Sequence, residues 1–130
     1  MSMTMEPPVT EVSQPFWDAT KERRLVLQWC RDCDQVVQYP RVACPGCLGT
    51  NLEWRPASGQ GQIYARIVVH GQGDPYVVAL VDTEEGARLM TNIVNCEPAK
   101  VAVGQAVQVT WRELSDQRAL PLFEPREGST

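Results

Sequence analysis

The pattern of hydrophobic and polar residues predicts strands over most of the second half of the chain. Five runs rich in β-branched and aromatic residues are separated by turn signals, and they cover residues 62–69, 76–82, 88–94, 106–112 and 118–123. One long connection, residues 95–104, separates the third run from the fourth. Five strands with that interruption favour a small, partly open OB-fold barrel over a two-sheet sandwich, which usually needs about seven strands.

In the first half of the chain, the sequence pattern predicts one helix and three short strands. A helix is expected from about residue 14 to residue 24, with Ser13 as its cap and Pro15 in its first turn. Two tight turns follow, each with a Cys-x-x-Cys pair, and short strands are expected at residues 25–29, 36–38 and 52–54. The helix and the cysteine turns therefore form a module of their own ahead of the barrel.

These elements predict four parts along the chain. Residues 1–12 show no apolar period and are expected to be a disordered leader. Residues 13–57 carry the helix and the cysteine module, residues 58–125 the OB-fold, and residues 126–130 a short tail.

Cys30, Cys33, Cys44 and Cys47 give the strongest chemical signal, with the spacing C-x2-C-x10-C-x2-C. Each pair lets two thiolates of one tight turn reach the same cation, and two such turns complete the tetrahedral shell of a structural zinc ion. All four ligands would be protein thiolates, so no position stays open for water and the ion is expected to be structural. The predicted fold is therefore mainly β: an N-terminal helix, a four-cysteine zinc ribbon and a five-stranded OB-fold barrel.

Two other states of these cysteines are alternatives. Disulfides are disfavoured, because the N-terminus lacks a basic region followed by an apolar one, and paired C-x2-C motifs in a reducing compartment mark metals. Iron in a rubredoxin-like site is a stronger competitor, because neither softness nor tetrahedral geometry separates it from zinc.

Charge and hydropathy narrow the possible functions. The chain has 130 residues and a net charge of −4, and four zinc-bound thiolates would make it two units more negative. Both halves are acidic, whereas binding to phosphate backbones requires a basic surface. The apolar runs are far shorter than the roughly 18 residues of a membrane span. We expect a cytoplasmic protein that does not bind nucleic acid.

No catalytic residue is predicted. Cys96 is most simply a small, partly buried hydrophobic residue at a strand end. His70 is expected in a loop, since no motif supplies it with a nucleophile or a substrate proton. The acidic residues Asp82, Glu84 and Glu85 are interpreted as solvated turn charges.

The aromatic residues allow two interpretations. Phe16 and Trp17 occupy adjacent helix positions and cannot both face one core. Ordinary core packing is the favoured interpretation, and an aromatic anchor for a partner protein is the alternative. The candidate partner contacts are Phe16, Trp17, Leu122 and Phe123.

The order of motifs along the chain resembles a known family. The motifs are Pro15-Phe16-Trp17, Cys30-x2-Cys33, Tyr39-Pro40-Arg41, Cys44-Pro45-x-Cys47, Gly59-x-Gly61-x-Ile63-Tyr64, Val103-Gly104-Gln105 and Ala119-Leu120-Pro121. They resemble the acyl-CoA-associated family with a rubredoxin-like zinc ribbon and a C-terminal OB-fold, long catalogued as a domain of unknown function. Asp34 stands where many relatives carry glycine after the first cysteine turn, which puts the geometry of that turn in question.

The resemblance implies a partner enzyme. Members of this family accompany thiolase-like enzymes, including acyl-CoA synthases and lipid-transfer-protein-like aldolases that act on steroid side chains. Some are paired with enoyl-CoA hydratases of the hot-dog fold. The resemblance therefore implies a non-catalytic subunit of a hetero-oligomer that stabilises or bridges such enzymes in acyl-CoA or lipid metabolism.

Two other functions are weighed against that one. A CoA or acyl-chain binding protein would hold its ligand in the barrel, with Arg66, Arg88, Arg112 or Arg118 near phosphates. A single-stranded nucleic-acid module is less favoured, because the sequence lacks the basic groove that such barrels use.

Overall fold

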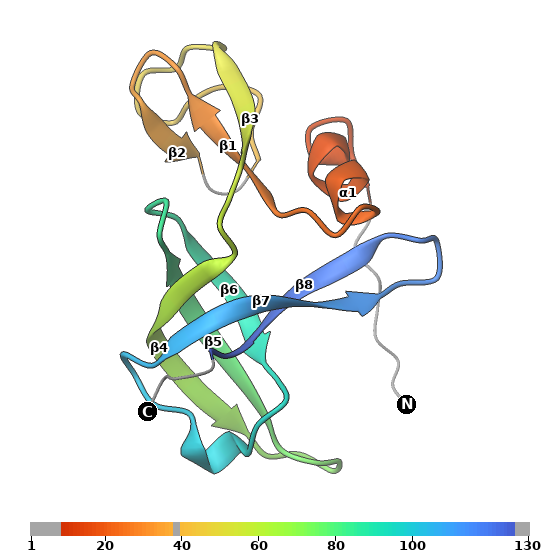
Figure 1. Ribbon diagram of the computed structural model, residues 1–130. Helices are drawn as coiled ribbons and strands as arrows, with labels where there is room; N and C mark the ends of the chain where they lie inside the picture. The colour runs from red at the N-terminus through yellow and green to blue at the C-terminus, as the bar shows by residue number, and fades with distance from the viewer. Residues whose placement is uncertain (1–8, 38–39, 127–130) are drawn as a thin grey trace.

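The structure is a computed structural model that describes residues 9–37 and 40–126, and Figure 1 shows its arrangement. The helices are α1 (Gln14–Thr20) and the short 3-10 helix η1 (Pro98–Lys100). The strands are β1 (Val26–Cys30), β2 (Gln35–Val37), β3 (Leu52–Pro56), β4 (Gln60–Val69), β5 (Tyr76–Thr83), β6 (Arg88–Ile93), β7 (Ala106–Glu113) and β8 (Ala119–Pro125). The predicted mainly β fold class is confirmed. Residues 1–8 of the predicted leader, residue 38 of a predicted strand and residues 127–130 of the predicted tail lie outside the described part.

The helix α1 is shorter than the sequence predicts. It ends at Thr20, four residues before the expected end, because Arg23 adopts a left-handed φ of 59° and Arg24 donates its backbone N–H back to the carbonyl of Ala19. The predicted capping bond is also absent, since the Ser13 hydroxyl pairs with Thr10 instead. The early end turns the chain toward β1.

The ribbon is a three-stranded antiparallel sheet with the order β2-β1-β3. Cys30 ends the central strand and pairs with Gln35 on one side and Leu52 on the other. The buried cluster of this region consists of Cys30, Val37 and Cys44. So small a cluster gives the cysteine end of the ribbon little hydrophobic stabilisation, and this makes the cysteine turns the centre of that end.

The barrel is closed, with the strand order β4-β5-β6-β8-β7 and β7 paired back to β4. The sequence predicted a partly open barrel. Closure comes from β8, which pairs antiparallel with β7 and parallel with β6 through Ile93 and Phe123. The buried core consists of Ile63, Val77, Ala79, Val81, Ile93, Val101, Val107 and Phe123.

The β7–β8 hairpin extends beyond the barrel and reaches α1 (Figure 1). Its last strand pair, Glu113 with Ala119, lies at the hairpin end. Because α1 is the first element of the chain and β7 and β8 are the last two, this contact joins the N-terminal and C-terminal parts of the chain. Neither helix in the described part of the chain has the length and apolar character needed to cross a bilayer.

Candidate functional site

The two cysteine turns bring four sulfur atoms together at one end of the ribbon. The Sγ atoms of Cys30, Cys33, Cys44 and Cys47 all lie within 4.8 Å of one another. The Cys30–Cys47 pair is 3.7 Å apart and the Cys33–Cys44 pair 3.9 Å. Four sulfurs bound tetrahedrally at the usual Zn–S length would be about 3.8 Å apart, so the spacing fits one ion.

The two turns share one backbone geometry. The residue after each Cys-x-x-Cys pair donates its N–H to the first cysteine's carbonyl, Asp34 to Cys30 at 2.8 Å and Leu48 to Cys44 at 2.7 Å. Asp34 and Leu48 both adopt left-handed φ values, 56° and 63°. A glycine would adopt this conformation without strain, but aspartate also tolerates it, so the turn doubted from the sequence forms without glycine.

Backbone N–H groups point at the sulfur atoms. The three bonds run from Cys33 to the Cys30 sulfur at 3.4 Å, from Gly46 to the Cys44 sulfur at 3.3 Å and from Gly49 to the Cys47 sulfur at 3.4 Å. The N–H groups of Cys47 and Gly46 lower the pKa of Cys44 to about 7. Such donors stabilise thiolates, the form in which cysteine binds a metal.

The thiols of Cys33 and Cys30 resist ionisation, because their pKa values are raised. The Cys47 side chain, together with burial, raises the pKa of Cys33 to about 12. The pKa of Cys30 is also raised: the N–H of Cys33 lowers it, but burial and the neighbouring thiols outweigh that bond. A divalent cation would remove this repulsion, so metal binding and loss of the thiol protons are coupled.

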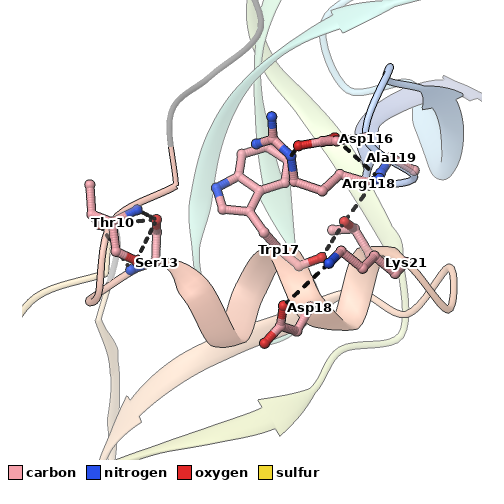
Figure 2. Close-up of polar contacts among 9 residues, drawn as sticks. Thr10, Ser13, Trp17, Asp18, Lys21, Asp116, Arg118 and Ala119 are labelled. Carbon is pink, nitrogen blue, oxygen red and sulfur yellow. Dashed lines mark hydrogen bonds and ion pairs between the residues drawn. The ribbon is translucent and has the colours of Figure 1, made fainter.

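A second cluster of polar contacts attaches α1 to the β7–β8 hairpin, as Figure 2 shows. The Arg118 guanidinium lies 4.8 Å from the centre of the Trp17 ring and donates to the Asp116 carboxylate at 2.6 Å. Partial burial would raise the pKa of Asp116, but the hydrogen bonds and charge of Arg118 hold it below its usual value. The Thr20 hydroxyl donates to the Trp17 carbonyl at 2.6 Å and accepts the Ala119 N–H at 3.2 Å.

An apolar cleft of about 420 Å³ lies where α1, the ribbon and the barrel meet. Phe16, Trp17 and Phe123 are among its lining residues. Trp17, Leu122 and Phe123 are buried within this chain, and Phe16 is half-buried. Three of the four candidate partner contacts therefore already pack inside the molecule, and direct contact through all four stays a prediction.

The other candidates from the sequence are dispersed. Cys96 packs partly against the barrel core, and burial raises the pKa of its thiol. Both observations agree with the prediction of a small, partly buried hydrophobic residue. His70 is exposed just after β4. The acidic cluster is divided: Asp82 pairs with Arg88, and half-buried Glu85 accepts the Ser58 N–H at 2.8 Å.

The buried roles of Thr20 and Arg118 were missed by the sequence analysis. Thr20 and Ala119 are 99 positions apart, so no local pattern connects them. Arg118 is only 5% exposed although it directly precedes β8. The available signal was the adjacency of Phe16 and Trp17, which cannot both face one core and left the neighbours of Trp17 unassigned.

Two family descriptions match the chain. Residues 17–53 match the ChsH2 rubredoxin-like zinc ribbon domain, and residues 54–112 match the ChsH2 C-terminal OB-fold domain. The first match and the clustered sulfurs confirm the predicted zinc cofactor. The assignment of each of the four cysteines as a ligand stays a prediction.

Three similar proteins cover most of this chain. A chain of the solved "Ltp2-ChsH2(DUF35) aldolase" is 37% identical and superposes with a TM-score of 0.83, over 92% of this chain and 98% of that one. The "DUF35 domain-containing scaffold protein" of Methanocaldococcus jannaschii is 35% identical over 77% of each chain. The "Probable enoyl-CoA hydratase alpha subunit" of Thermomonospora curvata is 39% identical over 91% of this chain, which spans only 39% of that protein.

These similarities agree with the geometry. The matched ribbon carries the four clustered cysteines, and the matched OB-fold domain covers most of the closed barrel. The scaffold relative is similar over more than two thirds of both chains. The chain therefore belongs to the DUF35 family, in which a ChsH2-type zinc ribbon precedes a C-terminal OB-fold domain.

Proposed function

We propose that this protein is a non-catalytic subunit that binds and stabilises a thiolase-superfamily enzyme acting on acyl-CoA thioesters. The similarity to the chain of the Ltp2-ChsH2(DUF35) aldolase carries the proposal, because it extends over 98% of that chain. A protein similar from end to end to one component of an enzyme named for two components is expected to have the same kind of role. The scaffold description of the archaeal relative supports a structural role.

The chemistry of the side chains also supports a role without turnover. The raised pKa of Cys96 keeps its thiol protonated at neutral pH, where a protonated thiol is a weak nucleophile. The four remaining cysteines are grouped for a metal without an open coordination position. Neither group has the features of an activated nucleophile or a Lewis-acid centre.

The hydratase relative does not extend the proposal to hydration. This chain spans about two fifths of that subunit, so the larger part of the hydratase subunit has no counterpart here. We propose that the region shared by this chain and the hydratase subunit is a docking region. In the complex formed by this chain, the catalytic residues would then come from the associated enzyme.

The apolar cleft favours a second candidate, an acyl-chain binding protein. A volume of about 420 Å³ is within the usual size of small-ligand sites. Three of the four arginines considered as phosphate contacts already have partners within the chain, which disfavours CoA itself, whereas Arg112 is exposed. Arg66 donates to the Val101 carbonyl, Arg88 pairs with Asp82, and Arg118 is buried against Trp17.

Co-expression tests the proposal. The chain is expressed with the thiolase-superfamily enzyme encoded beside its gene, and we expect one complex in size exclusion that contains both proteins and about one zinc per chain. The Cys96→Ala and His70→Ala variants should leave the activity of the complex within a few-fold of wild type, since neither residue has a catalytic partner.

Two results would contradict the proposal. A thousandfold loss of activity in either variant would identify a catalytic residue. A chain that stays monomeric beside the enzyme, yet binds acyl-CoA thioesters in calorimetry, would favour the acyl-chain binding protein.

A further inference from the structure

The strands β4, β5 and β6 have apolar side chains on both faces. The inward residues of β5 alternate with Tyr76, Val78 and Leu80, which point away from the barrel core. The register places Val78 opposite Ile67 of β4 and Leu80 opposite Met90 of β6. Together with Tyr64, which is the extra residue at the β4 bulge, these residues form the outer apolar face: Tyr64, Ile67, Tyr76, Val78, Leu80 and Met90.

This face is exposed to a degree that is unusual for such residues. Ile67 is 61% exposed, Met90 64%, and the two tyrosines about half. An antiparallel sheet with one solvated face normally alternates apolar and polar residues, whereas an uninterrupted apolar run marks a strand covered on both sides. The run from Tyr76 to Val81 is uninterrupted, so β5 has the composition of a strand whose outer face is covered.

The opposite side of the same barrel shows the usual pattern. Val107 of β7 points into the core, and its neighbours Gln108, Thr110 and Arg112 occupy the alternate positions. The barrel fold itself therefore does not require an apolar exterior, and the outer apolar face has a separate cause.

The position of the face in the fold indicates binding. The strands β5 and β6 are the second and third strands of the barrel, and the face of these strands is the usual ligand surface of OB-folds. Nucleic-acid binding there depends on cationic side chains along the backbone track. Here Arg88 lies 3.5 Å from the Tyr64 ring centre and bonds both carboxylate oxygens of Asp82, at 2.6 and 3.2 Å. The Arg88–Asp82 pair is neutral overall. The surface therefore suits the apolar surface of a partner protein better than a polyanion.

The size of the face and the similarity to a subunit of an enzyme favour an enzyme as the partner. The two half-exposed tyrosines of the face, with Ile67 and Met90, present roughly 400 Å² of mostly apolar surface. A lasting interface buries roughly 1,000 Å² or more in total, so the partner must also contact the polar rim, including Arg88. The similar chain, matched over 98% of its length, comes from a solved structure named as an Ltp2-ChsH2(DUF35) aldolase, which favours an enzyme over a second copy.

We infer that the outer apolar face of β4, β5 and β6 is the surface on which the thiolase-superfamily enzyme docks. This inference rests on the proposed function and adds the location of the interface. It differs from the contacts predicted from the sequence, since Trp17, Leu122 and Phe123 are buried within the chain itself.

Charge insertion tests the location. Tyr76→Glu and Ile67→Lys change exposed side chains that do not line the apolar cleft, as Met90 does, so the variants should keep the zinc content and melting temperature of wild type. Each should weaken binding of the full chain to the co-expressed enzyme at least about 30-fold in calorimetry, because a charge replaces an apolar anchor. Val103→Glu is the matched control: Val103 is 65% exposed but lies outside the face, and its variant should bind within about twofold of wild type.

The outcomes separate the two proposals. If wild type binds the enzyme and both face variants bind equally well, the docking face is wrong and the proposed function stands. If wild type forms no complex, the proposed function fails and the docking face with it. If wild type is a homodimer that the face variants convert to monomers, the face belongs to a second copy and the docking inference is overturned.

Discussion

The ribbon and the barrel are both small β structures, but they are held together by different forces. The barrel buries a core of eight side chains from Ile63 to Phe123. The buried cluster around the cysteine turns consists of Cys30, Val37 and Cys44, and two of these three residues point their sulfur atoms at the metal position. Val26 and Leu27 of β1 are also buried, but they line the cleft that faces α1 and the barrel. One chain thus contains a domain stabilised by apolar burial and a module stabilised by metal ligation, and loss of either force should affect one region first.

We expect the largest effect from removal of the metal, which should unfold the ribbon and leave the barrel folded. Cys44→Ser should lose zinc and unfold the ribbon, because structural zinc contributes on the order of 10 kcal/mol to the folding of such modules. The barrel strands should keep their amide signals in NMR spectra. Cys96→Ser makes the same chemical change outside the ribbon and should retain about one zinc per chain in elemental analysis. A metal-free variant that melts as cooperatively as wild type would refute this division, and stoichiometric iron would change only the identity of the ion.

The second effect addresses the barrel. Phe123→Ala should cost about 3–5 kcal/mol of unfolding free energy in a denaturant titration, because Phe123 is fully buried in the core. Zinc should stay bound at denaturant concentrations that already unfold the barrel. Phe16→Ala, at a half-buried position, is the control and should cost less. Simultaneous loss of zinc and barrel structure would show one cooperative unit instead of two regions.

The third effect tests the connection between the regions. Thr20→Val keeps the side-chain shape but leaves the buried Ala119 N–H without its acceptor, so it should cost about 1–3 kcal/mol. Thr20→Ser keeps the hydroxyl and should cost less. Hydrogen exchange of the Ala119 amide provides a local measurement, and equal protection in wild type and Thr20→Val would contradict the bond.

The smallest effect has the opposite sign. Leu48 is exposed and has a left-handed φ of 63°, so Leu48→Gly should stabilise the ribbon by about 0.5–1 kcal/mol, the relief of strain exceeding the entropy cost of glycine. Asp34→Gly should gain less, because aspartate tolerates this conformation better. Thermal melting of zinc-loaded protein would measure both. A lower melting temperature for Leu48→Gly would show that the turn is not strained.

Local patterns predicted the local parts of this molecule. The cysteine spacing predicted the metal and both turns, because all of its chemistry lies within 18 consecutive residues. The strand runs predicted the five barrel strands to within about two residues. The end of α1 could not be predicted, because it depends on a left-handed Arg23 and on a Thr20 hydroxyl whose partner lies on β8.

The functional surfaces were harder to predict than the fold. The adjacent Phe16 and Trp17 left open which of the two rings is buried, and Arg118 covers the Trp17 ring from a distant hairpin. The apolar run from Tyr76 to Val81 was visible in the sequence, yet only the strand register shows which of its residues point outward. Both differences arise from contacts between segments far apart in the chain, which a local pattern does not record.

The bond between α1 and the β7–β8 hairpin has a mechanical consequence. Residues 57–59 connect the ribbon to the barrel, and a linker of that length alone would allow the two regions to rotate relative to each other. Because α1 is fastened to the hairpin and continues into β1, the chain closes a loop: linker, ribbon, helix, hairpin, barrel (Figure 1). Two separate attachments restrict rotation of the ribbon relative to the barrel more than the linker alone would. Bodies attached to the two regions would then vary less in distance and orientation.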